Sequence, residues 1–462
     1  MYYVVKLVCS TKNALHIQYI VLEDVMMSIE KINQAKAEIA STSAYKTITE
    51  FFDAESFCEI DAFAKSGEGF AEVVAGFGMV EGMPVYAFAQ NSDICGGAMS
   101  KAQAQKLKKI YDLARKTGAP VVGFYDSIGG RLAQGTELLA GCGEVLNCSA
   151  ALSGVVPQIS VILGTCLGTS ALSAASADVV IMSEKAQLSL SVTGENSDAK
   201  YNAENGVAAM VAKDTQEAVA MAKELMLYLP SNNLNMAPQS FEEEPAEDGG
   251  CIVGKTVDGN SAVKLFEDYG KNAVVSLARL GGQVVGVVKT NGGKLDCEST
   301  SKIAKFVRFC DAFSLPVLSF VDCNGFESIK SAAKAASAYA EATTVKISVV
   351  TGKAIGSAYI ALAGTGANAD VVYALPEAVI SPVNVEAAAF IMAPEAMNVP
   401  VAEQKTIAEK FADENLLAYN AAQDGYVDGI VEQAQLRQTL ISALDMLSGK
   451  RVPTVSKKHS TI

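Results

Sequence analysis

The sequence predicts an α/β protein built as two similar domains, each a twisted, mainly parallel sheet with helices on its faces. The chain has 462 residues, 50% of them hydrophobic, and single hydrophobic cores stop growing at about 250–300 residues. The glycine-punctuated segment GTCLGTSALSAASADVV, which starts at Gly164, returns as GKAIGSAYIALAGTGANADVV from Gly352. In both halves, strand-like and helix-like patterns also follow one another in the same order, which indicates an internal duplication.

The first half of the chain sets out this order. Residues 72–91 hold two apolar runs around a Glu-Gly pair, which predicts a β-hairpin. Residues 101–120 have the periodicity of a helix, and Gly118 is expected to end it. Residues 120–127 and 157–164 are short apolar runs followed by small residues, as expected of buried parallel strands.

The second half repeats the same order. Residues 276–291 predict the hairpin and residues 300–316 the helix. Residues 316–325 and 345–352 predict the two buried strands. The second small-residue turn then follows, as it does in the first half.

A linker is expected between the halves. The stretch from Leu229 to Gly250 is rich in Pro, Asn and Glu, a composition typical of connecting segments. We therefore expect an N-terminal domain over residues 1–240 and a C-terminal domain over residues 251–462.

The composition argues against several classes of partner. The chain has 37 Lys and Arg against 51 Asp and Glu, and the net charge of -14 would repel nucleic acid and anionic lipid.

Its ten cysteines contain no CxxC pair, so we expect no metal site and reduced thiols in a cytoplasmic protein. The first residues lack the basic and sustained apolar regions of a signal peptide, so we expect no export. The uncharged stretch between Glu144 and Asp178 is broken by Pro157, so we expect no membrane insertion. The basic run at residues 106–109 is typical of a solvated face.

Two motifs suggest other functions. GGCIVGKT, at residues 249–256, matches the phosphate-binding pattern GxxxxGK[ST], but the acidic stretch before it and the Asp-Gly pair after it do not suit a strand-loop-helix unit. GTCLG, at residues 164–168, resembles a nucleophile elbow with Cys166 as nucleophile. The two histidines, His16 and His459, lie near opposite ends of the chain, so a base for this thiol is not evident. A Cys166 hydrolase remains one hypothesis.

The two glycine turns suggest a different chemistry. In each copy a buried strand runs through two glycines into a small-residue helix, at residues 164–168 and 352–356. Glycine lets a ligand approach the backbone closely, and the first N–H groups of a helix have no partner within it. Such a turn can stabilise an oxyanion such as an enolate. The alternative is that the glycines only permit close packing of helix against strand.

Longer segments of the chain resemble a known family. These are FGMVEGMPVYAFAQNSDICGGAMSKAQAQKLKKIYDLARKTGAPVVGFYDSIGGRLAQGTELLAG, VVPQISVILGTCLGT, FVRFCDAFSLPVLSFVDCNGF, AYAEATTVKISVVTGKAIGSAY and DGYVDGIVEQAQLRQTLISALDML. They are similar to the carboxyltransferase subunits of biotin-dependent acyl-CoA carboxylases and decarboxylases. The resemblance implies two crotonase-like domains. It also implies that Gly168 and Thr169 hold the enolate oxygen of an acyl-CoA, and that Gly356 and Ser357 hold the ureido oxygen of biotin.

The resemblance also implies residues that bind the acyl-CoA and the cofactor. Arg131 occupies an arginine position near the acyl-CoA site, and Ile360 lies where the acyl pocket is lined and suits a short acyl chain. For the loop glycines, turn geometry alone is an equally good explanation. The remaining candidates are Gly96, Gly97, Gly129, Gly130, Ala354 and Ile355.

The family implies several partners. The chain has no Met-Lys-Met attachment motif, so biotin is expected on a separate carrier protein, together with a biotin carboxylase or a decarboxylase membrane subunit. The chain itself is expected to form a dimer or a trimer of dimers. Thr169 and Ser357 stand where the family commonly has a second glycine, and residues 325–335 form a shorter loop than usual. A decarboxylase subunit running the same chemistry in reverse and a catalytically degenerate assembly or CoA-binding paralogue therefore remain alternatives.

Overall fold

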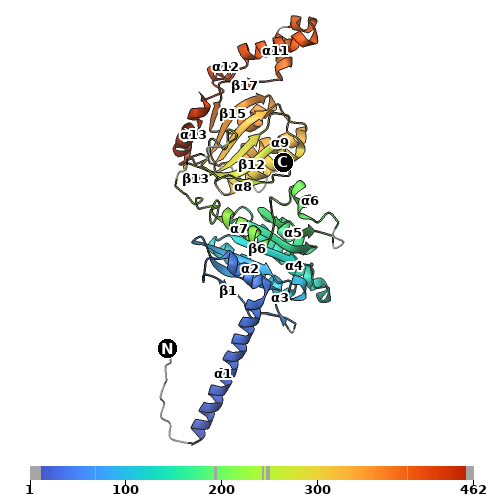
Figure 1. Ribbon diagram of the computed structural model, residues 1–462, viewed down its shortest axis with the longest axis vertical. Helices are drawn as coiled ribbons and strands as arrows, with labels where there is room; N and C mark the ends of the chain where they lie inside the picture. The colour runs from blue at the N-terminus through green and yellow to red at the C-terminus, as the bar shows by residue number, and fades with distance from the viewer. Residues whose placement is uncertain are drawn as a thin grey trace.

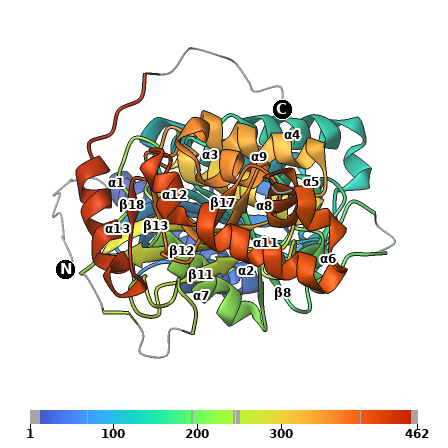
Figure 2. The same cartoon turned by 90° about the horizontal axis from the view of Figure 1, so that it is seen from above.

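Two eight-stranded sheets with the same strand order form the body of the protein. The computed structural model describes residues 12–67, 69–191, 195–241, 244–245, 250–392 and 394–453. The two domains are stacked along the long axis (Figure 1), and in the view along that axis they largely overlap, with α11 crossing in front (Figure 2). The predicted α/β fold with two duplicated domains is confirmed.

The first sheet has the order β1-β4-β5-β6-β7-β8-β10, with β9 paired to β7. Its strands are β1 (Cys58–Glu59), β4 (Val73–Val80), β5 (Met83–Gln90), β6 (Val121–Ser127), β7 (Gln158–Leu167), β8 (Val179–Ser183), β9 (Gln187–Ser189) and β10 (Met210–Ala212). Its helices are α2 (Ser43–Phe51), α3 (Lys101–Thr117), α4 (Thr136–Ala150), α5 (Thr169–Ala175), α6 (Ala199–Glu204) and α7 (Thr215–Met226), with short turns η1 (Cys95–Gly97) and η2 (Leu132–Gln134). A separate pair is formed by β2 (Lys65–Ser66) and β3 (Gly69–Phe70), and α1 (Lys12–Ser41) projects from this domain (Figure 1).

The second sheet has the order β11-β12-β13-β14-β15-β16-β18, with β17 paired to β15. Its strands are β11 (Val263–Leu265), β12 (Ala273–Leu280), β13 (Gln283–Thr290), β14 (Val317–Cys323), β15 (Lys346–Ile355), β16 (Val371–Ala374), β17 (Val379–Ser381) and β18 (Gly429–Ile430). Its helical segments are α8 (Cys297–Ala312), α9 (Ile329–Glu341), η3 (Tyr359–Ala363), η4 (Thr365–Ala367), α10 (Val385–Met392), η5 (Pro394–Asn398), α11 (Val401–Asn415), α12 (Ala418–Gln423) and α13 (Gln433–Leu447). The predicted hairpins, helices and strands are therefore present in both halves.

The two hairpins are stabilised in the same way. In the first, the turn residues Glu81 and Gly82 both have positive φ, and their N–H groups donate to the Asp53 carboxylate at 3.0 and 3.1 Å. In the second, the N–H groups of Gly281 and Gly282 donate to Asp258 at 2.9 and 2.8 Å. A carboxylate thus accepts the two N–H groups that the tight turn leaves without a ladder partner.

The helices that follow the hairpins also begin alike. Ser100 caps α3 by accepting the N–H of Gln103, and Asp296 caps α8 by accepting the N–H of Ser299. Helix α3 ends at Gly118, which has a left-handed conformation with φ +65°. Aligning the two N-caps matches the helices residue by residue.

A continuous apolar core joins the domains. One cluster of buried side chains runs from α2 and α7 in the first domain into the β12–β13 hairpin and α8 in the second. The N–H of Phe266 donates to Ala209 O at 2.8 Å, and the hydroxyl of Tyr228 donates to Ser261 O at 2.8 Å. The domains are therefore packed against each other as well as linked.

The segment from Leu229 to Gly250 contains no helix or strand in its described part. Asn233 N donates to Val155 O in the first domain, and Ser240 N donates to Gly282 O in the second. The chain therefore passes from one domain to the other between these residues. Among the described helices, none has the length and apolar character needed to span a bilayer.

We predict that Asp258→Ala destabilises the protein far more than Asp53→Ala. Asp258 is 1% exposed and also pairs with Arg437 at 2.9 Å. Removing it breaks this buried ion pair and also takes the acceptor from the N–H groups of Gly281 and Gly282, which together costs about 3–5 kcal/mol. Asp53 is less buried, and its loss should cost about 1 kcal/mol. Urea denaturation of both variants measures the difference, and equal losses would contradict the role given to the buried ion pair.

Candidate active site at two glycine turns

Each glycine turn follows a bulge in the central strand of its sheet. In the first domain β6 and β7 pair in register up to Ile162, and then Cys166 lies opposite Ser127. In the second, β14 and β15 pair in register up to Val350, and then Ala354 lies opposite Cys323. The extra residues bend β7 and β15 at corresponding points.

An aspartate fills each bulge. Asp126 Oδ1 accepts the N–H of Thr165 at 3.0 Å, and Asp322 Oδ1 accepts the N–H of Lys353 at 2.9 Å. A Cβ added at Gly164 would collide with the Asp126 carboxylate, and one at Gly352 would collide with Asp322. The first glycine of each turn is therefore required by packing, as the alternative interpretation of the sequence proposed.

The second glycine of each turn sets the direction of the chain. Gly168 has φ +60° and Gly356 has φ +53°, a region that favours glycine. Gly168 N donates to Ser189 O at 2.9 Å, and Gly356 N donates to Ser381 O at 2.8 Å. Both glycine N–H groups are therefore already hydrogen-bonded to the short neighbouring strand.

The N–H groups available to a ligand are those that come next. Thr169 and Ser170 begin α5, and Ser357 and Ala358 occupy the same place in the second domain. The first N–H groups of a helix have no acceptor inside it. Of the four residues predicted to be catalytic, Thr169 and Ser357 are thus placed to donate, while Gly168 and Gly356 provide the backbone conformation.

Two further loops meet the first turn. Ser127 Oγ lies 3.3 Å from Ser170 Oγ, and a Cβ on Gly129, which has φ +115°, would lie 3.5 Å from Leu167 O. Met99 N donates to Gly129 O at 2.7 Å, which ties the loop after β5 to the loop after β6. The glycine loops predicted from the sequence therefore lie together at the ends of β5, β6 and β7.

The glycines of these loops have packing reasons. A Cβ on Gly97 would collide with Asp126 O, and one on Gly130 would collide with the Leu138 side chain. Gly96 has φ +62°. Backbone conformation or close packing accounts for all three positions, whatever they contact when a ligand is bound.

Arg131 takes part in a largely buried ion pair. Its guanidinium lies 2.8 Å from Glu72 Oε1 and donates to Ser66 Oγ at 2.5 Å and to Cys95 Sγ at 3.0 Å. Glu72 is fully buried and also accepts the Ser100 hydroxyl at 2.6 Å. The arginine therefore ties the loop after β6 to the start of β4.

The second domain has the same loop geometry with different side chains. Leu295 N donates to Gly325 O at 2.9 Å, and Glu327 N donates to Leu295 O at 3.0 Å. The matching bond in the first domain runs from Arg131 N to Met99 O. Glu327 thus occupies the position of Arg131 and reverses the charge of that loop.

A cavity of about 460 Å³ adjoins the second turn. Ile360 lines it and is 62% exposed, whereas Ala354 and Ile355 are buried in β15 and do not line it. The first helical turn after Ser357 continues as a π-helix, η3, which differs from the regular helix α5 of the first domain. The cavity is lined by Gly356, Tyr359, Ile360, Ile380, Ser381, Pro382, Asn415, Leu416, Asn420, Ala421, Asp424 and Tyr426.

Cys166 lies in a poor place for a nucleophile. It is fully buried in β7, and burial raises the pKa of its thiol well above the usual range, so it stays protonated. His459 lies outside the described residues, and His16 belongs to the projecting helix α1. No cluster of metal-binding side chains occurs among the described residues. The phosphate-loop match at 249–256 also lacks its context, since residues 250–256 form turns that no helix follows and Gly249 lies outside the described residues.

Comparison with known proteins identifies the family. The model of the carboxyl transferase domain matches residues 40–462. The chain belongs to the carboxyl transferase domain family. It is 34% identical to methylmalonyl-CoA decarboxylase subunit alpha of Veillonella parvula, covering 91% of this chain and 92% of the relative. It is 33% identical to a putative propionyl-CoA carboxylase beta chain of Bacillus subtilis, covering 94% and 96%.

A solved structure extends the carboxyl transferase match to the whole fold. The crystal structure of transcarboxylase 12S, described as a hexamer with hydrolysed methylmalonyl-coenzyme A bound, superposes with a TM-score of 0.85 and 31% identity. The superposition covers 98% of this chain and 99% of that one. The duplicated domains predicted from the sequence are therefore those of the carboxyl transferase fold.

The sequence analysis missed Asp126 and Asp322. Each stands near the end of the first predicted buried strand of its half, in YDS and VDC, at matching positions of the repeat. This match between the two halves could have pointed to the aspartates. A lone aspartate at a strand end also resembles an ordinary turn residue, so the signal was weak.

We predict that Gly352→Ala destabilises the protein by about 1–3 kcal/mol, because its methyl group would overpack against Asp322. Gly366→Ala is the matched control, since an added Cβ there meets nothing within 4 Å. Thermal unfolding measures both changes. A control variant as unstable as Gly352→Ala would show that packing against the aspartate is not the cause.

Proposed function

We propose that this carboxyl transferase moves a carboxyl group between biotin, carried by another protein, and the α-carbon of a short acyl-CoA. The observation that supports this best is the repeated turn: each domain bends a central strand over an aspartate and presents the first N–H groups of a helical segment. One turn would hold the enolate oxygen of the thioester and the other the ureido oxygen of biotin. The domains would span residues 1–240 and 251–462.

At the first turn, the N–H groups of Thr169 and Ser170 would donate to the thioester oxygen as negative charge develops on it. A donor fixed in place before the reaction is worth about 3–4 kcal/mol of transition-state stabilisation. Neither side chain needs to titrate. The Cys142 thiol donates to the Thr169 hydroxyl at 3.4 Å, and the backbone N–H groups are the donors that the start of the helix holds in place.

The second turn suits the ring system of biotin. Ser357 offers a backbone N–H for the ureido oxygen, and the adjoining cavity has apolar walls from Ile360, Ile380 and Leu416. When bound, biotin supplies the carboxyl group to be transferred and a ring nitrogen that takes the α-proton. This role needs no basic side chain here, and Asp126 and Asp322 already accept backbone N–H groups.

The substrate is proposed from the relatives and from Ile360. Relatives are named for methylmalonyl-CoA and propionyl-CoA, and an apolar residue at this position suits a short acyl chain. The same site serves carboxylation and decarboxylation, because the charged intermediate is common to both directions. The partners would be a biotin carrier protein with either a biotin carboxylase or a decarboxylase membrane subunit, and the chain would act in the cytoplasm.

The active protein is proposed to be an oligomer. Figure 1 separates α5, in the lower domain, from β17, which adjoins the second turn at the far end of the upper domain. One chain therefore does not bring its own two turns together. A complete site would join the first turn of one copy to the second turn of another, in a dimer or a trimer of dimers.

We predict that Ser357→Pro abolishes carboxyl transfer while Ser357→Ala retains it. Proline is tolerated at the first position of a helix but lacks the N–H, so the variant removes the donor alone. The loss should be about 10²–10³-fold in kcat, as for other oxyanion donors. Turnover is measured with free biotin and malonyl-CoA or methylmalonyl-CoA, and acyl-CoA binding by calorimetry.

Binding and turnover together distinguish the alternatives. Retained acyl-CoA binding with lost transfer in Ser357→Pro assigns the second turn to biotin. Equal turnover in the proline and alanine variants would overturn that assignment. A native protein that binds acyl-CoA and shows no transfer, including with its purified biotin carrier, would instead be an assembly or CoA-binding paralogue.

We predict that Cys166→Ala keeps carboxyl transfer within about threefold of the native rate. The thiol is buried and protonated, and Ala354 fills the matching position in the second domain. Steady-state kinetics on the two proteins test this. Complete loss of turnover in a folded variant would favour the hydrolase hypothesis.

A further inference from the structure

The duplicated helices α3 and α8 carry basic residues at matching positions. With the N-caps Ser100 and Asp296 aligned, Lys106 corresponds to Lys302 and Lys109 to Lys305. The position of Arg308 is held by Asp112 in the first domain. Because of the duplication, the surroundings of each basic residue on α8 can be compared with those of the matching residue on α3.

In the first domain both lysines are neutralised. Lys106 Nζ lies 3.0 Å from Glu59, and Lys109 Nζ lies 2.7 Å from Asp61. Lys106 is buried, so its carboxylate partner is needed to offset the loss of hydration. These cations serve the structure.

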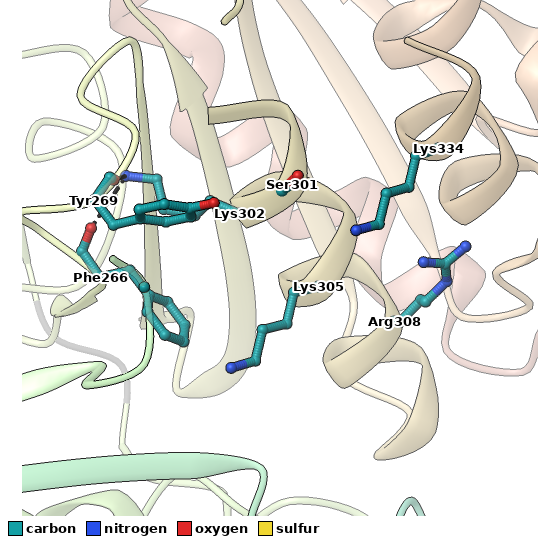
Figure 3. Close-up of a pocket in the computed structure, with 8 residues that line it drawn as sticks. Phe266, Tyr269, Ser301, Lys302, Lys305, Arg308 and Lys334 are labelled. Atoms are coloured by element: carbon teal, nitrogen blue, oxygen red, sulfur yellow. Dashed lines mark hydrogen bonds between the residues drawn. The ribbon is translucent and has the colours of Figure 1, made fainter. Parts of the chain in front are cut away.

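In the second domain the corresponding lysines form no ion pair within the described residues, and Asp296 and Glu267 act on Lys302 only at longer range. Lys302 Nζ donates to Phe266 O at 3.2 Å and to Tyr269 O at 2.6 Å, and Lys305 Nζ lies 4.6 Å from the centre of the Phe266 ring. Neither forms an ion pair within the described part of the chain, nor does Lys334. Figure 3 shows Lys305 and Arg308 on successive turns of α8, with Lys334 reaching toward them from α9.

These cations line a cavity of about 380 Å³. None of its eight lining residues is acidic, although the chain as a whole carries a net charge of -14. The Tyr269 ring forms part of the wall and packs on Gly206 of the first domain, where an added Cβ would lie 2.7 Å from the ring. The lining residues are Gly206, Phe266, Tyr269, Ser301, Lys302, Lys305, Arg308 and Lys334.

Burial makes this cluster of cations unfavourable without an anion. It lowers the pKa of Lys302 to about 8, and it also lowers the pKa of Lys305. The carboxylate whose charge acts on Lys305 is Asp178, which accepts the N–H of Gln158 at 2.8 Å instead of forming an ion pair with the lysine. An ammonium has three donors, so Lys302 retains one beyond its two backbone bonds.

We propose that this pocket, the α8–α9 anion pocket, binds a phosphorylated small molecule of the diphosphate class. Lys305, Arg308 and Lys334 present separate positive charges to one cavity, and a guanidinium matches phosphate oxygens in pairs. The Tyr269 ring adds an aromatic wall that suits the base of a nucleotide. No residue of either glycine turn lines the pocket, so the site is additional to the proposed function.

The test is calorimetric titration of the full-length protein with pyrophosphate, ADP, coenzyme A and dephospho-coenzyme A at fixed low salt. We expect binding of pyrophosphate and ADP that weakens at least tenfold in Lys305→Gln with Arg308→Gln. Lys305→Arg should keep the affinity. Lys109→Gln, the matching position on α3, should leave it unchanged, and thermal unfolding checks that each variant is folded.

Displacement of ADP distinguishes two sources of the ligand, and two other results would overturn the proposal. If coenzyme A displaces ADP, and dephospho-coenzyme A displaces it less well, the pocket takes the nucleotide end of a coenzyme A molecule. If neither displaces ADP, the ligand is a free nucleotide or pyrophosphate. Absence of binding by every probe at millimolar concentration would overturn the proposal, as would equal affinity in the native protein and the double variant.

Discussion

A carboxylate held against a glycine at a strand bulge determines the local structure of both turns. When β7 and β15 bulge, the N–H of Thr165 or Lys353 leaves the ladder with the preceding strand and needs another acceptor. Asp126 and Asp322 supply that acceptor. They fit only because Gly164 and Gly352 have no side chain. The bulge then directs each strand into its second glycine and sets the orientation of the N–H groups that follow.

The two glycine turns share this backbone arrangement, but the residues around them differ. The residue paired with the bulged strand next to the turn is Ser127 in the first domain and Cys323 in the second. In the loop that follows this residue, the positive Arg131 is replaced by the negative Glu327. A regular helix follows the first turn, whereas a π-helix beside an apolar cavity follows the second. The first N–H groups after the two turns are therefore set in differently shaped and charged surroundings. Such a difference is expected if the turns hold two chemically different oxygens, as proposed.

The sequence predicted the elements well because their signals are local. Apolar runs, tight-turn residues and helix caps lie next to one another in the chain, and the repeat supports each assignment twice. The sequence did not reveal contacts between distant segments. Ser189 O, which accepts the Gly168 N–H, belongs to a three-residue strand too short to recognise. The pairing of Arg131 with Glu72 joins separate loops. Lys106, expected on a solvated face, is instead buried against Glu59, so that expectation was wrong.

The same duplication separates structural charge from functional charge. A lysine on the inner face of α3 or α8 extends its stem along the same kind of packed surface, so both helices face a similar desolvation cost. The first domain offsets that cost at Lys106 with Glu59, which shows that a carboxylate can be accommodated beside this helix. In the second domain the corresponding cations converge on a cavity with no acidic lining. Structural stability alone would favour a carboxylate beside them, and the arrangement is therefore best explained by an anion supplied from solution.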